Sequence, residues 1–144
     1  KKIEEATAIY LVRNPNGRLP KQIQTVTKRY ASAQGKDPMA QWSDTEELLR
    51  ETLEDDPKDW YNIDPVHLQK QTAASERYKK IDWQFVSLDN FSTWATTNDY
   101  ESFELFAENA DPALIALINF FIEECGVEDL YKEDFELYET ISNQ

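Results

Sequence analysis

The chain has 144 residues, of which 40% are hydrophobic, and these include 4 Trp, 7 Tyr and 7 Phe. Disordered acidic tails lack aromatic residues, so we expect residues 1–144 to form one acidic, helical domain with a single packed core. Because the chain opens on Lys1, that domain can be a piece of a longer protein. Only 3 Gly are present, which disfavours a many-stranded sandwich or barrel, whose turns need positive φ.

Cysteine and histidine are too few for the commonest structural sites. One Cys cannot form an internal disulfide, and one His with one Cys cannot build a zinc site alone. The longest apolar run, Ala113–Ile122, is interrupted by Asn119 and is well short of the roughly 20 residues that a membrane helix needs. No apolar signal-peptide core follows the N-terminus. We therefore expect a cytoplasmic, reducing location, no cofactor and no membrane partner.

The formal net charge of −13 is the strongest signal in the composition. Basic residues predominate in the first 40 positions, and acidic residues predominate in the remainder. A surface this negative repels nucleic acid and attracts a basic partner, with a range that salt shortens.

The first elements in chain order are ambiguous between helix and strand. Residues 3–13 carry apolar positions at helical spacing, and we expect a helix, with a β-branched strand at residues 7–12 as the alternative. Residues 14–17 (Asn-Pro-Asn-Gly) predict a turn. A second helix is expected to begin at Pro20 and to end at Gly35.

Two further helices are predicted from their N-terminal signals. Ser43 and Glu46 form a capping-box pattern for a helix that ends before Pro57. Asp64–Pro65 predicts a polar surface helix that continues to about residue 80. Residues 81–88 alternate well enough for a short strand, and residues 7–12 are its natural partner.

The C-terminal half is expected to be helical. Short helices are predicted at residues 89–97 and 99–108. Asp111–Pro112 should cap a nearly all-apolar helix that ends at Gly126, and its apolar character predicts the buried centre of the fold. A last helix is expected at residues 133–141. The predicted fold class is mostly α: an irregular bundle of about six to seven short helices, to which a small two-stranded β element can be added.

Sequence motifs for catalysis are weak. The three glycines are isolated, so they cannot form a phosphate-binding loop. His67 has no obvious partner nearby in sequence, and we interpret it as a surface residue. Cys125 lies at the C-terminal end of the apolar helix beside Glu123 and Glu124, where helix carbonyls and carboxylates disfavour a thiolate. We interpret it as a structural thiol.

Carboxylate clusters suggest a divalent-metal enzyme, which is the second alternative. The clusters are Glu54, Asp55, Asp56 and Asp59, and Glu128, Asp129, Glu133 and Asp134. Neither has the spacing of a known metal loop, and a solvated acidic face is the favoured interpretation.

Two other features could contact a partner. Trp60 and Tyr61 lie between two prolines and could form an exposed protein-binding anchor. Basic residues near the N-terminus could contact nucleic acid, but pairing with the acidic remainder of the chain is favoured, so direct nucleic-acid binding is disfavoured. These residues are Arg18, Lys21, Lys28 and Arg29.

Acidic stripes at helical spacing suggest a different hypothesis. Glu47, Glu51 and Asp55 form one stripe, and Glu101, Glu104 and Glu108 form another. Carboxylates four residues apart rise by about 6 Å along a helix, so a ladder of them can imitate part of the charge pattern of a DNA duplex. The region from residue 101 onward, with its run N-A-D-P-A-L-I-A-L-I-N-F-F-I-E-E, resembles the helical middle of anti-restriction DNA mimics.

The favoured function is therefore a non-catalytic protein-interaction or regulatory domain that binds a basic partner through an acidic surface, and a DNA mimic that inhibits a nucleic-acid-binding protein is the alternative. We expect no catalytic, metal or cofactor site. The predicted partner-binding residues are Glu47, Glu51, Asp55, Trp60, Tyr61, Glu101, Glu104 and Glu108.

Overall fold

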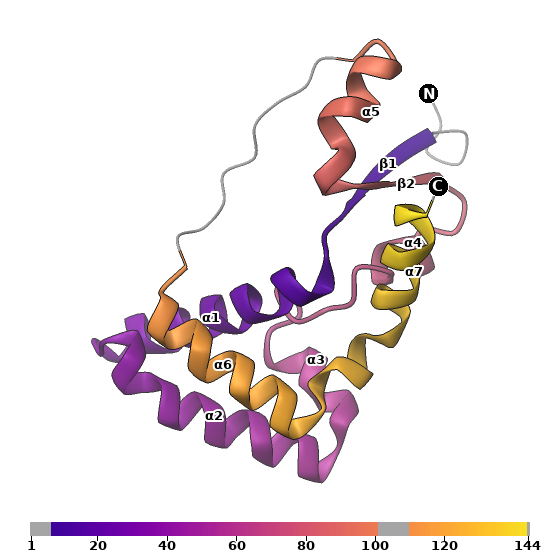
Figure 1. The fold of residues 1–144 in the computed structure, drawn as a ribbon. Coiled ribbons are helices and arrows are strands. Elements are labelled where there is room, and N and C mark those ends of the chain that lie inside the picture. Colours follow the sequence, from indigo (N-terminus) through magenta and orange to yellow (C-terminus); the bar gives the residue numbers. More distant parts are fainter. Residues whose placement is uncertain (1–6, 101–109, 144) are drawn as a thin grey trace. The chain divides into compact units, whose positions relative to one another are not determined.

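The computed structural model describes residues 7–100 and 110–143 of the chain. Within these residues it contains seven α-helices and one small two-stranded sheet, which confirms the predicted mostly α fold class (Figure 1). No helix in the described ranges is both long and apolar enough to cross a membrane.

Strand β1 (Thr7–Val12) corrects the helix predicted at residues 3–13. It pairs in parallel with β2 (Asp82–Ser87), from Thr7 opposite Asp82 to Val12 opposite Ser87. The strand predicted at residues 81–88 and its proposed partner are both confirmed. The helix prediction failed because the apolar positions of this segment fit either period, and only the distant β2 decides between them.

The described residues group into two compact units, and each is considered by itself. Unit 1 contains the described parts of residues 1–15, 70–107 and 132–144, and unit 2 contains those of residues 16–69 and 108–131. That the whole chain forms one domain stays a prediction.

Unit 1 is built around the sheet. It holds four further elements, which are α4 (Ala73–Arg77), the 3-10 turn η3 (Leu88–Asn90), α5 (Phe91–Thr97) and α7 (Lys132–Ser142). Asp134 of α7 is fully buried, and its carboxylate accepts backbone hydrogen bonds from Gln71 (2.7 Å) and Thr72 (3.1 Å). This carboxylate therefore has a structural role, because it ties α7 to the segment that leads into α4.

Unit 2 is helical. Its elements are α1 (Pro15–Gln34, whose first residue belongs to unit 1), α2 (Pro38–Asp55), the 3-10 turn η2 (Pro57–Asp59), α3 (Trp60–Ile63), α6 (Pro112–Cys125) and the 3-10 turn η4 (Val127–Tyr131).

Helix α1 begins earlier than predicted, so the turn expected at residues 14–17 was wrong. Pro15 occupies its first position, where an amide hydrogen would have no partner within the helix. Pro20, the predicted start, lies inside the helix. The predicted end is confirmed, because Gly35 follows the last residue with a φ of +65°.

Helix α2 also begins earlier than predicted. Its N-cap is Asp37, whose carboxylate accepts a hydrogen bond from the Met39 amide, and Pro38 takes the first helical position. The capping box predicted at Ser43 and Glu46 lies inside the helix and was wrong. Asp37–Pro38 is the same start signal as Asp111–Pro112, with an Asp N-cap and Pro in the first helical position.

The long helix predicted from residue 64 to about residue 80 does not form. Asp64 does cap a turn, because its side chain accepts hydrogen bonds from the amides of Val66 and His67. Only the five-residue helix α4 follows. The helix predicted at residues 99–108 falls largely outside the described residues, and at its start Asp99 has a φ of 60°.

Helices α5, α6 and α7 confirm the predictions for residues 89–97, 112–125 and 133–141. Asp111 caps α6, and Gly126 ends it in the left-handed conformation. The Asp111 amide also donates to the buried Gln24 side chain of α1 at 2.8 Å, which fixes the start of α6. One prediction was wrong: α6 is buried along one side only, because Leu117 and Phe120 are exposed.

The core of unit 2 is aromatic. Phe121 of α6 stacks on Trp60, with ring centroids 6.3 Å apart, and meets the edge of Trp42 of α2 at 5.9 Å. The Trp60 indole donates a hydrogen bond to the Tyr131 hydroxyl (2.7 Å), which in turn donates to the Leu68 carbonyl (2.6 Å). This relay satisfies the polar groups that come with burying Trp60 and Tyr131 completely.

We expect Tyr131→Phe to lower the free energy of unfolding by about 1–3 kcal/mol, because the Trp60 N–H and the Leu68 carbonyl would lose their buried partner. Urea unfolding followed by Trp fluorescence measures this change. Tyr138→Phe is the matched control, since that hydroxyl donates to Asp89 at an exposed site and its loss should cost under about 1 kcal/mol. Equal losses at the two positions would contradict the relay.

Candidate functional site

Helix α2 has a buried side and an acidic side. Gln41, Trp42, Thr45 and Leu49 are buried. Glu47, Glu51 and Asp55 recur every four residues on the outer side and are exposed, as is Glu54 beside them. The predicted stripe at residues 47, 51 and 55 therefore lies on one accessible face, which we call the acidic face.

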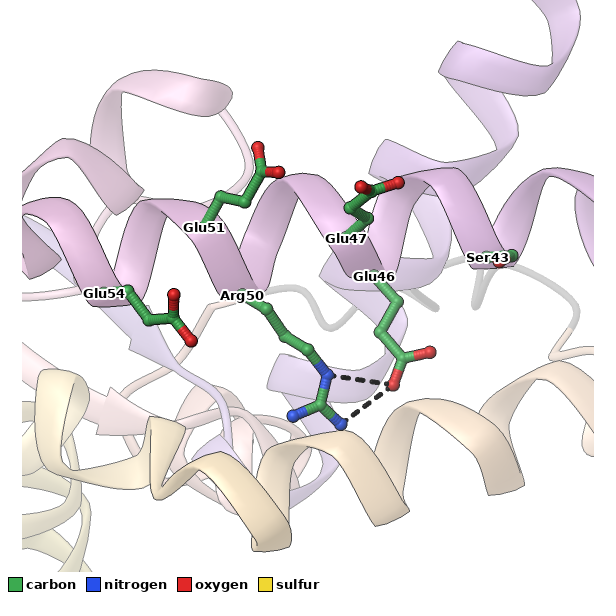
Figure 2. Close-up of a pocket in the computed structure, with 6 residues that line it drawn as sticks. All are labelled: Ser43, Glu46, Glu47, Arg50, Glu51 and Glu54. Carbon is green, nitrogen blue, oxygen red and sulfur yellow. Dashed lines mark hydrogen bonds and ion pairs between the residues drawn. The ribbon is translucent and has the colours of Figure 1, made fainter.

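A shallow hollow of about 350 Å³ lies along this helix. Figure 2 shows Glu46, Arg50 and Glu54 directed toward the neighbouring helix α6, whereas Glu47 and Glu51 point away from it. Ser43 completes the lining. Of the charged side chains that border the hollow, only Arg50 is positive.

Arg50 is held by groups of this same unit. It donates to the Glu46 carboxylate from Nη2 (3.0 Å), pairs with Glu124 of α6 (3.2 Å) and donates to the Cys125 sulfur (3.2 Å). Its guanidinium also lies 5.4 Å from the centre of the Phe121 ring. The hydrogen bond with Glu46, chiefly, raises the pKa of Arg50, and burial opposes this shift. Because this single cation is paired with Glu46 and Glu124, carboxylates predominate around the hollow.

Glu124 lies near the C-terminus of α6, where a carboxylate opposes the helix dipole. Its ion pair with Arg50 offsets this cost and joins α6 to α2. Sequence reasoning missed Arg50, since nothing local marks the only cation between residues 37 and 57 as the partner of a distant carboxylate.

The predicted anchor pair lies within unit 2. Trp60 is completely buried, and the hydroxyl of the half-buried Tyr61 donates to the Leu130 carbonyl. This burial argues against Trp60 as an exposed anchor. The second predicted stripe, Glu101, Glu104 and Glu108, lies outside the described residues.

The carboxylate clusters do not converge. No group of three or more His, Cys, Asp or Glu side chains in residues 7–100 and 110–143 is placed to hold a metal ion. Asp56 caps the turn η2 through the Lys58 amide, and Asp134 binds backbone amides as described above. Both carboxylates are engaged in hydrogen bonds with the backbone.

Several basic residues of the N-terminal segment contact acidic groups or backbone within unit 2. Arg29 pairs with Asp64 (3.5 Å), Lys36 pairs with Asp44 (3.6 Å), and Arg18 donates to the Gln69 carbonyl (2.9 Å). Two of the four residues considered for nucleic-acid contact, Arg18 and Arg29, are therefore engaged within unit 2.

His67 does have a partner nearby in sequence, contrary to the expectation for this residue. Its Nδ1 lies 3.1 Å from both oxygens of Asp64, three residues earlier, and Asp64 also pairs with Arg29. Burial alone would raise the pKa of Asp64, but the hydrogen bonds from the His67 amide and ring outweigh it and lower that pKa. Asp64, His67 and Arg29 therefore stabilise the turn that follows Asp64.

Cys125 is half-buried, and burial is the main cause that raises the pKa of its thiol. The charge of Arg50 opposes this shift, and the charges of Glu124 and Glu46 add to it. The thiol is thereby kept protonated, as expected for a structural cysteine.

Comparison with known proteins adds no functional information: no family model, no curated protein and no solved structure matches this chain.

We expect Cys125 to react with iodoacetamide more slowly than a free cysteine at pH 8, because little thiolate is present. Glu124→Gln should speed the reaction by about threefold, since it removes a charge that raises the thiol pKa. Glu123→Gln changes the neighbouring exposed carboxylate and is the control. Equal rates for the two variants would contradict the electrostatic account.

Asp64→Asn should lower the free energy of unfolding by about 0.5–1 kcal/mol at pH 7. The folded-state pKa of Asp64 is depressed, so its contribution is complete above the ordinary value of about 3.9 and is lost as the pH falls through the lower folded value. Urea unfolding of both proteins between pH 7 and pH 2 should therefore show the gap closing only in acid. A gap independent of pH would contradict this assignment.

Proposed function

We propose that this chain is a non-catalytic protein-interaction or regulatory module that binds a basic partner through the acidic face of α2. One observation carries the proposal: the carboxylates of Glu47, Glu51, Glu54 and Asp55 are exposed together, while the cation beside them, Arg50, is held by Glu46 and Glu124. Among the ion pairs of the described residues, none involves these four carboxylates.

Electrostatics favours association from a distance. The net charge of −13 and the acidic face act in the same direction, so a basic surface is attracted before contact. Each exposed carboxylate contributes little alone, and a cluster gives orientation and a faster association rate rather than high affinity. The resulting binding must weaken as salt shortens the Debye length from about 10 Å at 0.1 M to about 3 Å at 1 M.

A DNA mimic that inhibits a nucleic-acid-binding protein is the second candidate, and the straight ladder at Glu47, Glu51 and Asp55 favours it. Its carboxylates span about 12 Å of the helix axis, comparable to a few phosphates along one DNA strand. Such a mimic would bind a DNA-binding protein in competition with DNA, whereas an ordinary acidic interaction module would not.

The deciding experiment is an affinity pull-down from native lysate with the full chain as bait, at 0.1 M and 1 M salt. We compare the unmodified chain with a triple variant of the acidic face, E47Q/E51Q/D55N. The matched control is E76Q/E128Q/E139Q, which removes the same charge from exposed positions on α4, η4 and α7. A partner should be recovered at low salt, released at high salt, lost by the triple variant and retained by the control.

Equal recovery by the two triple variants would show that net charge alone acts and would overturn the proposal. Nuclease treatment and added duplex DNA separate the two candidates. Release of the partner by added DNA supports the mimic, and indifference to DNA supports an interaction module of another kind.

A further inference from the structure

Helix α6 presents apolar side chains to solvent along a line that flanks its buried residues. Phe120 is 64% exposed and Leu117 is 42% exposed, and Ala113 is exposed one turn before Leu117. Spaced at i, i+4 and i+7, these three residues share one face of the helix, which we call the apolar strip. A single exposed apolar residue needs no explanation, but aligned ones indicate a contact surface.

The apolar strip is linked to α2 at its C-terminal end. Glu124 follows Leu117 and Phe120 at positions i+7 and i+4, so it continues the line of the strip toward the end of the helix. Its carboxylate reaches Arg50 of α2, which borders the hollow. Glu46, Arg50 and Glu54 are directed from α2 toward α6, on the side of the hollow (Figure 2). Within unit 2 the apolar strip therefore ends at the ion pair of Glu124 with Arg50, on the side of α2 toward which Glu54 is directed and from which Glu47 and Glu51 point away (Figure 2).

We propose that the apolar strip and the acidic face together form one docking surface for a basic amphipathic helix of a partner protein. This inference rests on the proposed function and narrows its partner class. Such a helix places its apolar side chains at the spacing of the strip and flanks them with Lys and Arg, which meet the carboxylates of α2.

Charge complementarity together with the apolar strip favours a basic amphipathic helix over three other occupants of this surface. A second copy of this chain would bring another net charge of −13 to a surface that is already acidic. An extended basic segment would satisfy the carboxylates and leave Phe120 exposed. A DNA-binding face made for phosphates would gain nothing from Leu117 and Phe120, because phosphate contacts are polar.

The test uses the full chain and two synthetic peptides of about 18 residues, which is five helical turns. Both contain only Leu and Lys in the same proportions. In the first, Leu recurs at helical spacing to form one apolar face, and in the second the order is scrambled so that Leu lies on all sides. Dissociation constants are measured by fluorescence anisotropy at two salt concentrations.

The amphipathic peptide should bind at least about tenfold more tightly than the scrambled peptide. The variant L117S/F120S should abolish that difference while leaving the binding of the scrambled peptide unchanged. Val66→Ser is the matched control, because Val66 is 75% exposed in the same unit and lies outside the strip. NMR shifts mapped on the unmodified chain locate the peptide independently, so misfolding of the variant cannot hide the answer.

Each outcome of these measurements supports or overturns the docking surface. Equal affinities for the two peptides, or shifts that avoid α6, overturn the docking surface; the proposed function survives if E47Q/E51Q/D55N still weakens both peptides. Failure of both peptides to bind overturns the two proposals together. Self-association of the unmodified chain that L117S/F120S removes would overturn the partner helix in favour of a second copy.

Discussion

The arrangement of unit 2 depends on one cation placed among carboxylates. Helices α2 and α6 are both acidic where they approach each other, and like charges there would oppose their packing. Arg50 resolves this conflict, because it pairs with Glu46 on its own helix and with Glu124 on the other while its planar group lies against Phe121. An arginine suits this position better than a lysine, since its fork of donors serves several acceptors at once. The surrounding carboxylates then remain outside this network and available to a partner.

Acidity and packing are separated by face on α2. Its inner side contributes Trp42 and Leu49 to an aromatic core, and its outer side carries exposed carboxylates that form none of the ion pairs of the described residues. Acidic residues elsewhere are used structurally, and each of the four Asp-Pro pairs supplies an example. Asp37, Asp56, Asp64 and Asp111 all accept backbone hydrogen bonds from the turn that follows them. The acidic residues of this chain therefore include both helix or turn caps and exposed surface charges, and the structure is needed to tell the two groups apart.

Local signals made much of this fold predictable. Asp111 and Gly126 mark the ends of α6 correctly, because a cap acts within one turn of itself. Features that depend on distant residues were not predictable: β1 is a strand because β2 pairs with it, and Glu124 sits at a helix end because Arg50 lies opposite. The acidic stripe on α2 could be predicted from residue spacing alone. The exposure of Phe120 could not be predicted, because a hydrophobic residue is expected to be buried and its sequence position does not show which side of the helix is covered.

Both units are assembled from separate stretches of chain, and this has a consequence for biosynthesis. During translation β1 emerges early but has no partner until β2 follows, and the parallel pairing requires the long crossover between them. Unit 2 needs α6 and η4, so it cannot close before residue 131 has been synthesised, and unit 1 also needs α7, at residues 132–142. Until then the exposed strand edge and unpacked aromatic residues are open to chaperones. A chain that ends before α6 would consequently lack elements of both units, whereas one that ends just before α7 would lack an element of unit 1 alone.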